Sequence, residues 1–217
     1  MMIKLPKHWQ RKKIGEIANI NMGQSPESMY INESNKGVPF CQGNTKFGYR
    51  YLNKPNKFCT KPTKIANKND VLLSVRAPVG ALNIASYNLC IGRGLSALYS
   101  KNNNNHFLYY LLLSLKNKIS RCSQGTTFES INRNDIEDLK CNIPTDIEQY
   151  KIAEILSTCD DCIETTEKLI EAKQRLKKGL MQKLLTGKIR FKEFIKSKQT
   201  QKTRFGDFPK DWEIKKI

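Results

Sequence analysis

The pattern of hydrophobic and polar residues divides the chain into two parts. Residues 1 to about 144 contain short apolar runs, such as Val71–Val75 and Leu95–Tyr99, separated by Gly, Pro and Asn. Short apolar runs bounded by turn residues are typical of strands joined by loops. A longer apolar run at about 106–120 follows the polar residues Asn102–Asn105 and predicts a helix. The first part is therefore predicted to mix helix and strand.

The second part begins after Pro144 and reads as one long helix. Thr145 and Glu148 have the spacing of a capping box, and no proline follows within the next forty residues. Acidic residues come early in this stretch and basic residues late, which suits the helix dipole. Gly187 is a natural stop. We expect a helix over about 145–188, roughly 60 Å long at 1.5 Å per residue.

The apolar residues of this helix advance by three or four, with a gap at Lys173, as they do in a coiled-coil seam. The stripe consists of Ile152, Ile155, Cys159, Ile163, Thr166, Leu169, Leu176, Leu180 and Leu184. It could pack on the chain's own first part instead. A small domain cannot cover so long a helix, so we favour a partner helix.

One segment of the chain occurs twice. Residues 5–14 return as residues 208–217, with six of ten positions identical and a spacing of 203 residues. A spacing of that size indicates a second copy of a whole domain rather than a short solenoid repeat. We predict a globular domain at 1–144, the long helix at 145–188, and a linker with the truncated start of a second copy at 189–217. The last ten residues are too few to fold alone.

Charge narrows the class of partner. The 217 residues include 38 Lys and Arg against 20 Asp and Glu, a formal net charge of +18, which favours binding to a polyanion. An anionic membrane surface would need an anchor. The longest apolar stretch, Phe107–Leu113, is far short of the roughly 20 residues that span a bilayer, and no signal-peptide core is visible. We therefore expect a nucleic-acid partner and no membrane.

The seven cysteines are scattered along the chain, which fits reduced thiols in a cytoplasmic protein better than disulfides. Cys159 and Cys162 form the only C-x-x-C pair, and no histidine or second pair lies nearby to complete a zinc site. We predict no metal site and interpret the pair as part of the apolar stripe.

Several segments of the chain together resemble a known family. In the first part these are Pro6–Ile14, Gly23–Pro26, Asp70–Gly80, Cys90–Gly94 and Ser123–Phe128. In the helix they are Glu148–Leu156 and Leu176–Gly187. With these segments the chain resembles the specificity (S) subunits of type I restriction-modification systems. The resemblance covers residues 4 to about 190. It implies an α+β fold, in which a mixed α/β target recognition domain is followed by a long helix that pairs as an antiparallel coiled coil.

The resemblance also implies a function without catalysis. Such a subunit recognises double-stranded DNA and carries the methyltransferase (M) subunits, which use S-adenosylmethionine, and a restriction (R) subunit, which uses ATP and magnesium. No cofactor is expected on this chain itself. The family's usual member has two recognition domains and two helices, whereas this chain has one of each. An identical chain could supply the missing helix through a two-fold contact, so we expect a homodimer that reads a bipartite palindrome.

Two loops and two isolated arginines are the candidate DNA contacts. Side chains that can read base edges, and glycines that permit close approach, gather at Gln42, Asn44, Lys46, Tyr49 and Arg50. A solvated hairpin is the alternative for this loop. Arg76 and Arg93, each near Gly or Pro, could face the DNA backbone or bond to loop carbonyls. Because the second loop is shared with the family, it is expected to position the DNA backbone rather than choose bases. Its candidates are Arg121, Gln124, Thr126 and Thr127.

Other functions have less support in the sequence. There is no P-loop and no H-E-x-x-H motif, and the only two histidines, His8 and His106, have no evident catalytic companion. We therefore predict a chain that is not an enzyme. The main alternative is a nonspecific basic nucleic-acid-binding protein, and a structural coiled-coil protein is a weaker one.

Overall fold

The computed structural model describes residues 6–122, 130–197, 199–204, 206–213 and 215. It forms two compact units, Met1–Cys159 and Asp160–Ile217, which divide within the longest helix. The helices are α1 (Ile14–Ile17), α2 (Asn105–Ser114), α3 (Lys116–Cys122), α4 (Arg133–Glu137) and α5 (Asp146–Leu184), with short 3-10 turns at Ser28–Tyr30 and Lys192–Phe194. The strands are β1 (Gln10–Lys13), β2 (Ala18–Met22), β3 (Ile31–Asn32), β4 (Val38–Cys41), β5 (Phe58–Cys59), β6 (Ile65–Ala66), β7 (Val71–Ser74), β8 (Leu82–Ile84), β9 (Leu89–Ile91), β10 (Leu95–Ser100), β11 (Lys140–Ile143), β12 (Thr200–Thr203) and β13 (Gly206–Pro209).

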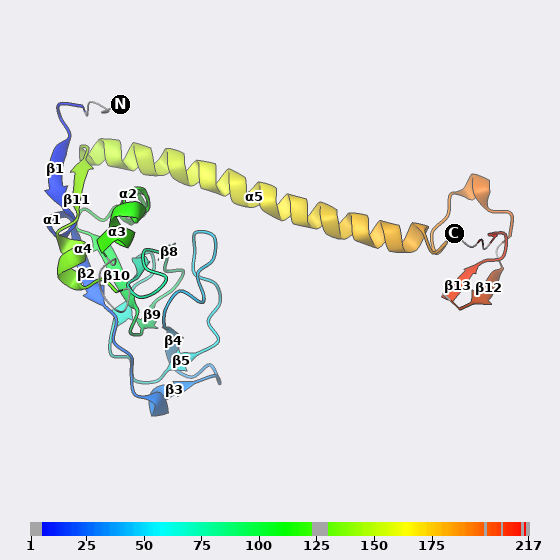
Figure 1. Cartoon of the computed structure of the whole chain (residues 1–217), viewed down its shortest axis with the longest axis horizontal. Coiled ribbons are helices and arrows are strands. Elements are labelled where there is room, and N and C mark those ends of the chain that lie inside the picture. The colour runs from blue at the N-terminus through cyan, green and yellow to red at the C-terminus, as the bar shows by residue number, and fades with distance from the viewer. Residues whose placement is uncertain (1–5, 123–129, 198, 205, 214, 216–217) are drawn as a thin grey trace. The chain divides into compact units, whose positions relative to one another are not determined.

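The centre of the first unit is an antiparallel sheet in the order β2-β10-β7-β8 (Figure 1). The strands expected at Val71–Val75 and Leu95–Tyr99 are β7 and β10, which pair with Leu95 opposite Ser74. All four residues of β7 are buried, because the sheet is covered on both faces. Val71 and Leu73 belong to the core formed with α2 and α3, whereas Leu72 belongs to a second core with residues of β9 and β10.

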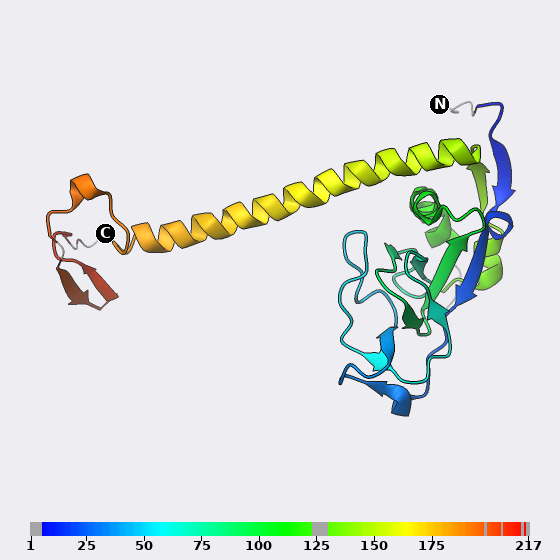
Figure 2. The ribbon, with the colours of Figure 1, turned by 180° about the vertical axis from the view of Figure 1, so that it is seen from behind.

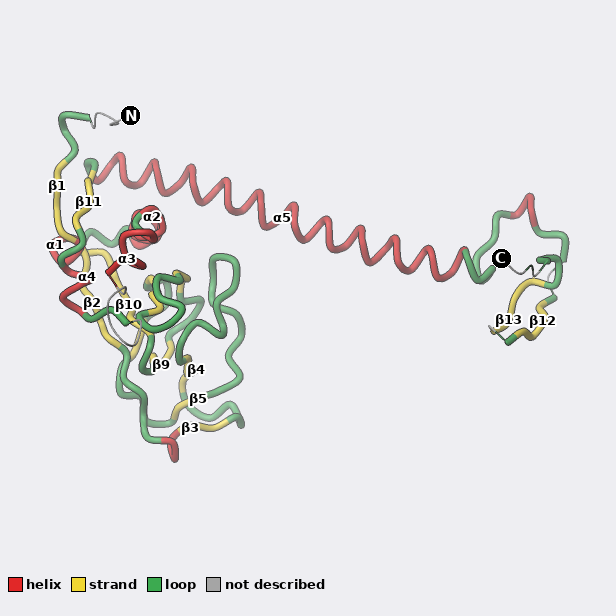
Figure 3. Tube along the Cα trace, viewed as in Figure 1, coloured by secondary structure: helices red, strands yellow, loops and turns green. Residues whose placement is uncertain are grey.

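The second sheet has the order β3-β5-β4-β9-β6, and β4 runs parallel to β9. Its strands are short, and loops make up much of this region, as Figure 3 shows in green. The longest of these connections runs from residue 42 to residue 57, between β4 and β5. It reaches toward the first half of α5 in both Figure 1 and Figure 2. This loop contains the first group of predicted DNA contacts.

The single helix expected at about 106–120 is two helices, α2 and α3. The side chain of Asn104 caps α2 by accepting a hydrogen bond from the Phe107 N–H at 3.0 Å, as its position in the polar run suggests. At Leu115 the backbone takes φ −92° and ψ 1°, and its N–H bonds to carbonyls of the preceding turn. The helix therefore ends at this residue and starts again one residue later. The pattern of apolar residues continues through Leu115, so it could not predict a break at this one residue.

Helix α5 begins one residue after Thr145 and ends three residues before Gly187. Gly187 has φ +71°, and a Cβ there would lie 2.3 Å from Pro209 Cγ, so glycine suits this exit. The Glu148 carboxylate accepts a hydrogen bond from Trp9 Nε1 at 3.3 Å and lies 3.1 Å from His8 Nε2. The carboxylate that suggested a capping box thus ties the N-terminal segment to the helix.

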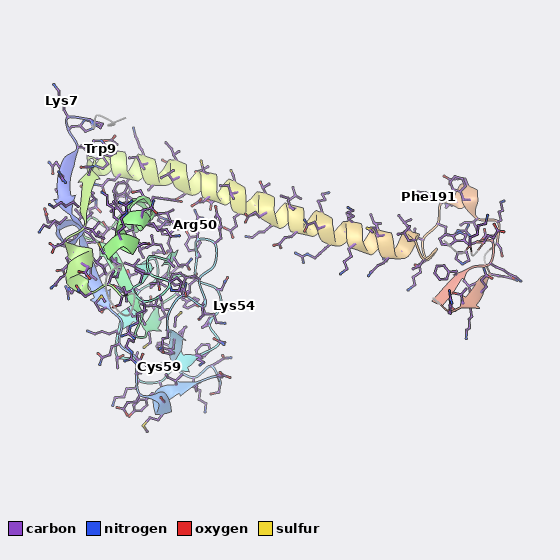
Figure 4. The ribbon with its side chains drawn as sticks, in the orientation of Figure 1. Lys7, Trp9, Arg50, Lys54, Cys59 and Phe191 are labelled. Atoms are coloured by element: carbon purple, nitrogen blue, oxygen red, sulfur yellow. The ribbon has the colours of Figure 1, made fainter. Side chains whose placement is uncertain are left out.

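The second unit contains a β12–β13 hairpin after the end of α5. Asp211 makes a two-bond ion pair with Arg190, at 2.7 and 2.9 Å, and the Arg190 guanidinium lies 5.8 Å from the Trp212 ring centre. The start of the second copy is therefore packed against the chain just after the helix. Figure 4 labels Phe191 in this region. Residues 208–213 of the second copy share this unit with the preceding linker.

Candidate nucleic-acid interface

Three segments that carried the family resemblance meet at one edge of the first unit. The N–H of Gly23 donates to Leu95 O at 2.8 Å, and the N–H of Gln24 donates to Ile91 O at 3.0 Å. The N–H of Arg93 donates to Ser25 Oγ at 3.0 Å, while the Arg93 side chain remains exposed. A Cβ at Gly23 would lie 2.4 Å from Gly92 O, so this close approach of two backbones requires glycine.

Arg76 reaches the same edge from the segment that follows β7. The N–H of Val75 donates to Gly94 O at 3.0 Å, and Gly94 has φ +101°. A Cβ built on Gly94 would lie 3.8 Å from Arg76 Cδ and 3.9 Å from Gly43 Cα. The Arg76 backbone also forms a bridge with Ser130, the first described residue after 122. The edge thus collects two exposed arginines beside the start of the 42–57 loop.

The loop adds a polar hollow to this edge. The hollow is lined by Phe40, Cys41, Gln42, Thr45, Lys46, Asn56 and Lys57. Gln42 and Lys57 are exposed and Lys46 is half-exposed, so one amide and two ammonium groups border it. Lys57 was not among the predicted contacts, although its place at the end of the same loop could have suggested it. We call Gln42, Lys46, Lys57, Arg76 and Arg93 the basic edge.

The 42–57 loop is held in one conformation by its backbone. The N–H of Asn53 donates to Lys46 O at 2.9 Å, and Phe47 pairs with Leu52. The Asn83 side chain donates to Gly48 O at 3.1 Å from below. Tyr49 is 53% exposed and Asn44 is half-exposed. This is a short hairpin with polar side chains at its surface, a geometry that suits either a base-reading loop or a solvated turn.

Arg50 differs from the prediction that it reads DNA. Its side chain is only 5% exposed, and Nη1 donates to the Ser157 carbonyl of α5 at 3.2 Å. The guanidinium carbon lies 4.8 Å from the centre of the Tyr51 ring. Figure 4 labels Arg50 on the side of the first unit that faces α5. Because the side chain is enclosed by protein, we remove Arg50 from the candidate DNA contacts.

The second predicted loop is described only at its beginning. Arg121 is exposed in the last turn of α3, as a phosphate contact would need to be. Gln124, Thr126 and Thr127 lie outside the described residues, and their predicted role stays a prediction.

Helix α5 carries the second candidate surface. Gln149 and Ala153 are buried and Ile152 packs against the core, so the first predicted stripe residue is already covered by the chain itself. Beyond it, Ile155 is 63% exposed, Leu169 56% and Leu176 55%. We define the apolar stripe as Ile155, Cys159, Ile163, Thr166, Leu169, Leu176, Leu180 and Leu184. Leu156, Ile170, Met181 and Leu185 extend it and were missed, because the prediction followed one column of residues.

Other kinds of site find little support in the described part of the chain. It contains no cluster of three or more metal-ligating side chains. Among the helices described there, none has both the length and the apolar character to cross a membrane. Burial raises the pKa of the Cys41 thiol, beside the basic edge, to about 11, so it is a neutral thiol at physiological pH.

Comparison with known proteins gives a consistent result. The family model of the type I restriction modification DNA specificity domain matches residues 6–174. A putative type I restriction enzyme MjaX specificity subunit of Methanocaldococcus jannaschii is 42% identical over 193 residues, which are 87% of this chain and 45% of that protein. The type I restriction enzyme MjaIX specificity subunit of the same organism is 27% identical over 99% of this chain and 52% of that protein.

Solved structures agree with the sequence comparisons. The HsdS subunit from Thermoanaerobacter tengcongensis matches with a TM-score of 0.66 and 33% identity, over 84% of this chain and 46% of that one. A chain from a structural study of the assembly of the type I R-M system matches with a TM-score of 0.69 and 34% identity, over 84% and 47%. Both confirm the mixed α/β domain with its long helix. This chain spans about half the length of these relatives, and it belongs to the type I restriction-modification DNA specificity family.

Proposed function

We propose that this chain has the role of a type I specificity subunit, acts as an antiparallel homodimer, and directs type I modification and restriction to a bipartite DNA target. It recognises DNA and catalyses no reaction. The observation that carries the proposal is the apolar stripe of α5, which lies exposed on a helix that the chain's own domain covers only at its start. Exposed apolar surface of this extent marks an interaction site.

The charges of α5 support a second copy of the same chain as the partner that covers the stripe. Residues 146–164 include six acids and one base, whereas residues 165–184 include two acids and six bases. Two such helices repel one another side by side in parallel. In the antiparallel orientation each acidic half faces a basic half, so the apolar stripe and the charges favour the same arrangement.

A two-fold dimer of this kind presents two identical recognition domains in opposite orientations. Each domain would contact one half-site, and the helical pair would fix the number of unread base pairs between them. The target is therefore a bipartite palindrome.

The basic edge supplies the DNA contacts in this proposal. Exposed Arg76, Arg93 and Arg121 bind phosphates, with Gln124, Thr126 and Thr127 nearby in sequence, whereas the side chains of the 42–57 loop read base edges. The base-reading candidates are Gln42, Asn44, Lys46 and Tyr49. Arg50 is excluded by its burial.

The partners follow from the family. We propose that the dimer binds M subunits, which require S-adenosylmethionine, and an R subunit, which requires ATP and magnesium, all in the cytoplasm. None of these cofactors is assigned to this chain.

The test is to express the chain with an M subunit of the same system, purify the complex, and map methylated bases across the host genome by single-molecule sequencing. A bipartite palindromic motif supports the proposal. An asymmetric motif keeps the specificity role and overturns the symmetric dimer. If no complex forms and no motif appears, nonspecific binding to nucleic acid becomes the better account of the +18 charge.

A further inference from the structure

The buried Arg50 has a geometry that links the two candidate surfaces. It lies in the 42–57 loop, yet its guanidinium bonds to α5 through the Ser157 carbonyl at 3.2 Å. The same nitrogen lies 3.5 Å from Tyr110 Oη of α2, and Tyr110 Oη lies 3.5 Å from Ser157 Oγ. One side chain of the loop thus meets two helices. We infer that Arg50 is a positioning residue that fixes the DNA-reading loop relative to α5 and thereby sets the spacer length of the bipartite target.

The buried Arg50 guanidinium is held in a defined orientation. A guanidinium that is 5% exposed must keep its hydrogen bonds, because leaving a buried charge without partners costs several kcal/mol. Because Arg50 Nη1 bonds to a backbone carbonyl, the planar guanidinium can take few orientations, whereas an apolar contact tolerates sliding. Tyr51 restricts the guanidinium further, since its ring centre lies 4.8 Å away.

Backbone hydrogen bonds connect Arg50 to the surface of the loop. The N–H of Ile84 in β8 donates to Arg50 O at 2.8 Å, and the N–H of Leu52 donates to Ile84 O at 2.9 Å. Across the hairpin, the N–H of Asn53 next to Leu52 donates to Lys46 O, and Lys46 belongs to the basic edge. Few torsions between Ser157 and Lys46 are therefore free to change.

The contact between Arg50 and Ser157 leaves the apolar stripe of α5 uncovered. Ser157 is not a residue of the apolar stripe, and it faces the chain's own loop. In the proposed dimer the helix pair sets the distance between the two half-sites. Arg50 attaches each DNA-reading loop to its helix in that pair. The inference rests on the proposed function, because a spacer exists only for a bipartite target.

The experiment repeats the methylation mapping with Arg50→Met, which keeps an unbranched side chain and removes the donors. Losing a hydrogen bond from a charged group should raise methylation at sites whose spacer is one base pair longer or shorter about tenfold relative to the main site. The half-site sequences and the dimer should not change. Two control variants should keep a single spacer: Lys54→Ala, an exposed base of the same loop, and Ser157→Ala, which retains the carbonyl that Arg50 binds.

A uniform loss of methylation without new spacers, or an unchanged single spacer, would overturn the inference, since a residue needed only for folding cannot widen the choice of spacer. Where Arg50→Met does not fold, Arg50→Lys decides in the same way, because an ammonium keeps the charge but not the fork. If the wild-type complex shows no bipartite motif, the proposed function fails and the inference fails with it. A wild-type motif with unaltered spacing in the Arg50 variants removes the inference alone.

Discussion

Lys46 and Arg93 lie on the same basic edge but in surroundings that suit different tasks. The N–H of Arg93 donates to Ser25 Oγ, and the N–H of the preceding Gly92 donates to Cys41 O, so the backbone is fixed while the exposed Arg93 side chain can reach a phosphate. Lys46 borders the hollow of the reading loop.

In the purified complex, Arg93→Ala should weaken binding to target and random duplexes alike and lower the slope of log affinity against log salt by about 1. Lys46→Ala should lower discrimination by about 1 to 3 kcal/mol.

Fluorescence anisotropy titrations of target and random duplexes between about 50 and 200 mM salt separate these outcomes. Lys36→Ala, an exposed lysine in the turn before β4, is the control for loss of one charge. If Arg93→Ala changed only the preference between sequences, its assignment to phosphate would be incorrect. If both variants left affinity and preference unchanged, the basic edge would not be the interface.

The sequence predicted which types of residue would contact DNA, but it did not predict which of these side chains would be buried. Gln42, Arg76, Arg93 and Arg121 are exposed as a binding role requires, whereas Arg50, only one residue away from exposed Tyr49, is enclosed by α2 and α5. The sequence separation of 107 residues between Arg50 and Ser157 explains the error. Composition cannot show that a loop folds back on a distant helix.

At the scale of elements, the Arg190–Asp211 pair holds the start of the second copy to the segment after α5. The Arg190 side chain lowers the pKa of Asp211 to about 2. Because the folded pKa lies below the ordinary value of 3.8, the pair stabilises this segment above about pH 4 and loses that effect as pH falls toward 2. Asp211→Asn should therefore open residues 188–212 to protease at neutral pH. Glu213→Gln, which breaks an exposed pair with Lys215, should not. Equal cleavage of the two variants would contradict this role for the pair.

The apolar stripe makes a second prediction at this scale. Leu176→Ala removes one leucine from each protomer, and at about 1.5 to 3 kcal/mol for each side chain the dimer should weaken by about 100-fold or more. Gln174→Ala, two residues away, uncharged and outside the stripe, is the matched control and should dimerise as the wild type does. Sedimentation velocity over a concentration series measures both constants. Equal dimerisation of the two variants would show that the stripe is not the contact.

Periodicity predicted α5 well and the small elements poorly. A pattern that repeats over 39 residues averages out local exceptions, so the start and the end of the helix fall within a few residues of the expected ones. The break at Leu115 and two-residue strands such as β5 and β6 carry no periodic signal. Their pairing is set by contacts between distant segments, including the parallel β4–β9 pair.

At the scale of the whole molecule, the orientation of the dimer can be tested through its charges alone. Asp160, Asp161 and Glu164 lie in the acidic half of α5, and Lys173, Lys177 and Lys178 lie in the basic half. A variant in which these three acids become Lys and these three bases become Glu keeps the net charge and the apolar stripe. Residues 146–164 change from six acids and one base to three acids and four bases, and residues 165–184 change from two acids and six bases to five acids and three bases, so the charge pattern is reversed. In an antiparallel pair, two reversed chains still place acid opposite base, so the variant should dimerise with itself. A reversed chain beside a wild-type chain places like charges together, so mixed dimers should be rare. A parallel pair gives the opposite result, because the reversed and wild-type helices would then be complementary.

The measurement mixes differently tagged wild-type and reversed chains, unfolds and refolds them together, and counts the mixed dimers by native mass spectrometry. A majority of mixed dimers would exclude the antiparallel arrangement, and with it the inverted half-sites on which the palindromic target depends.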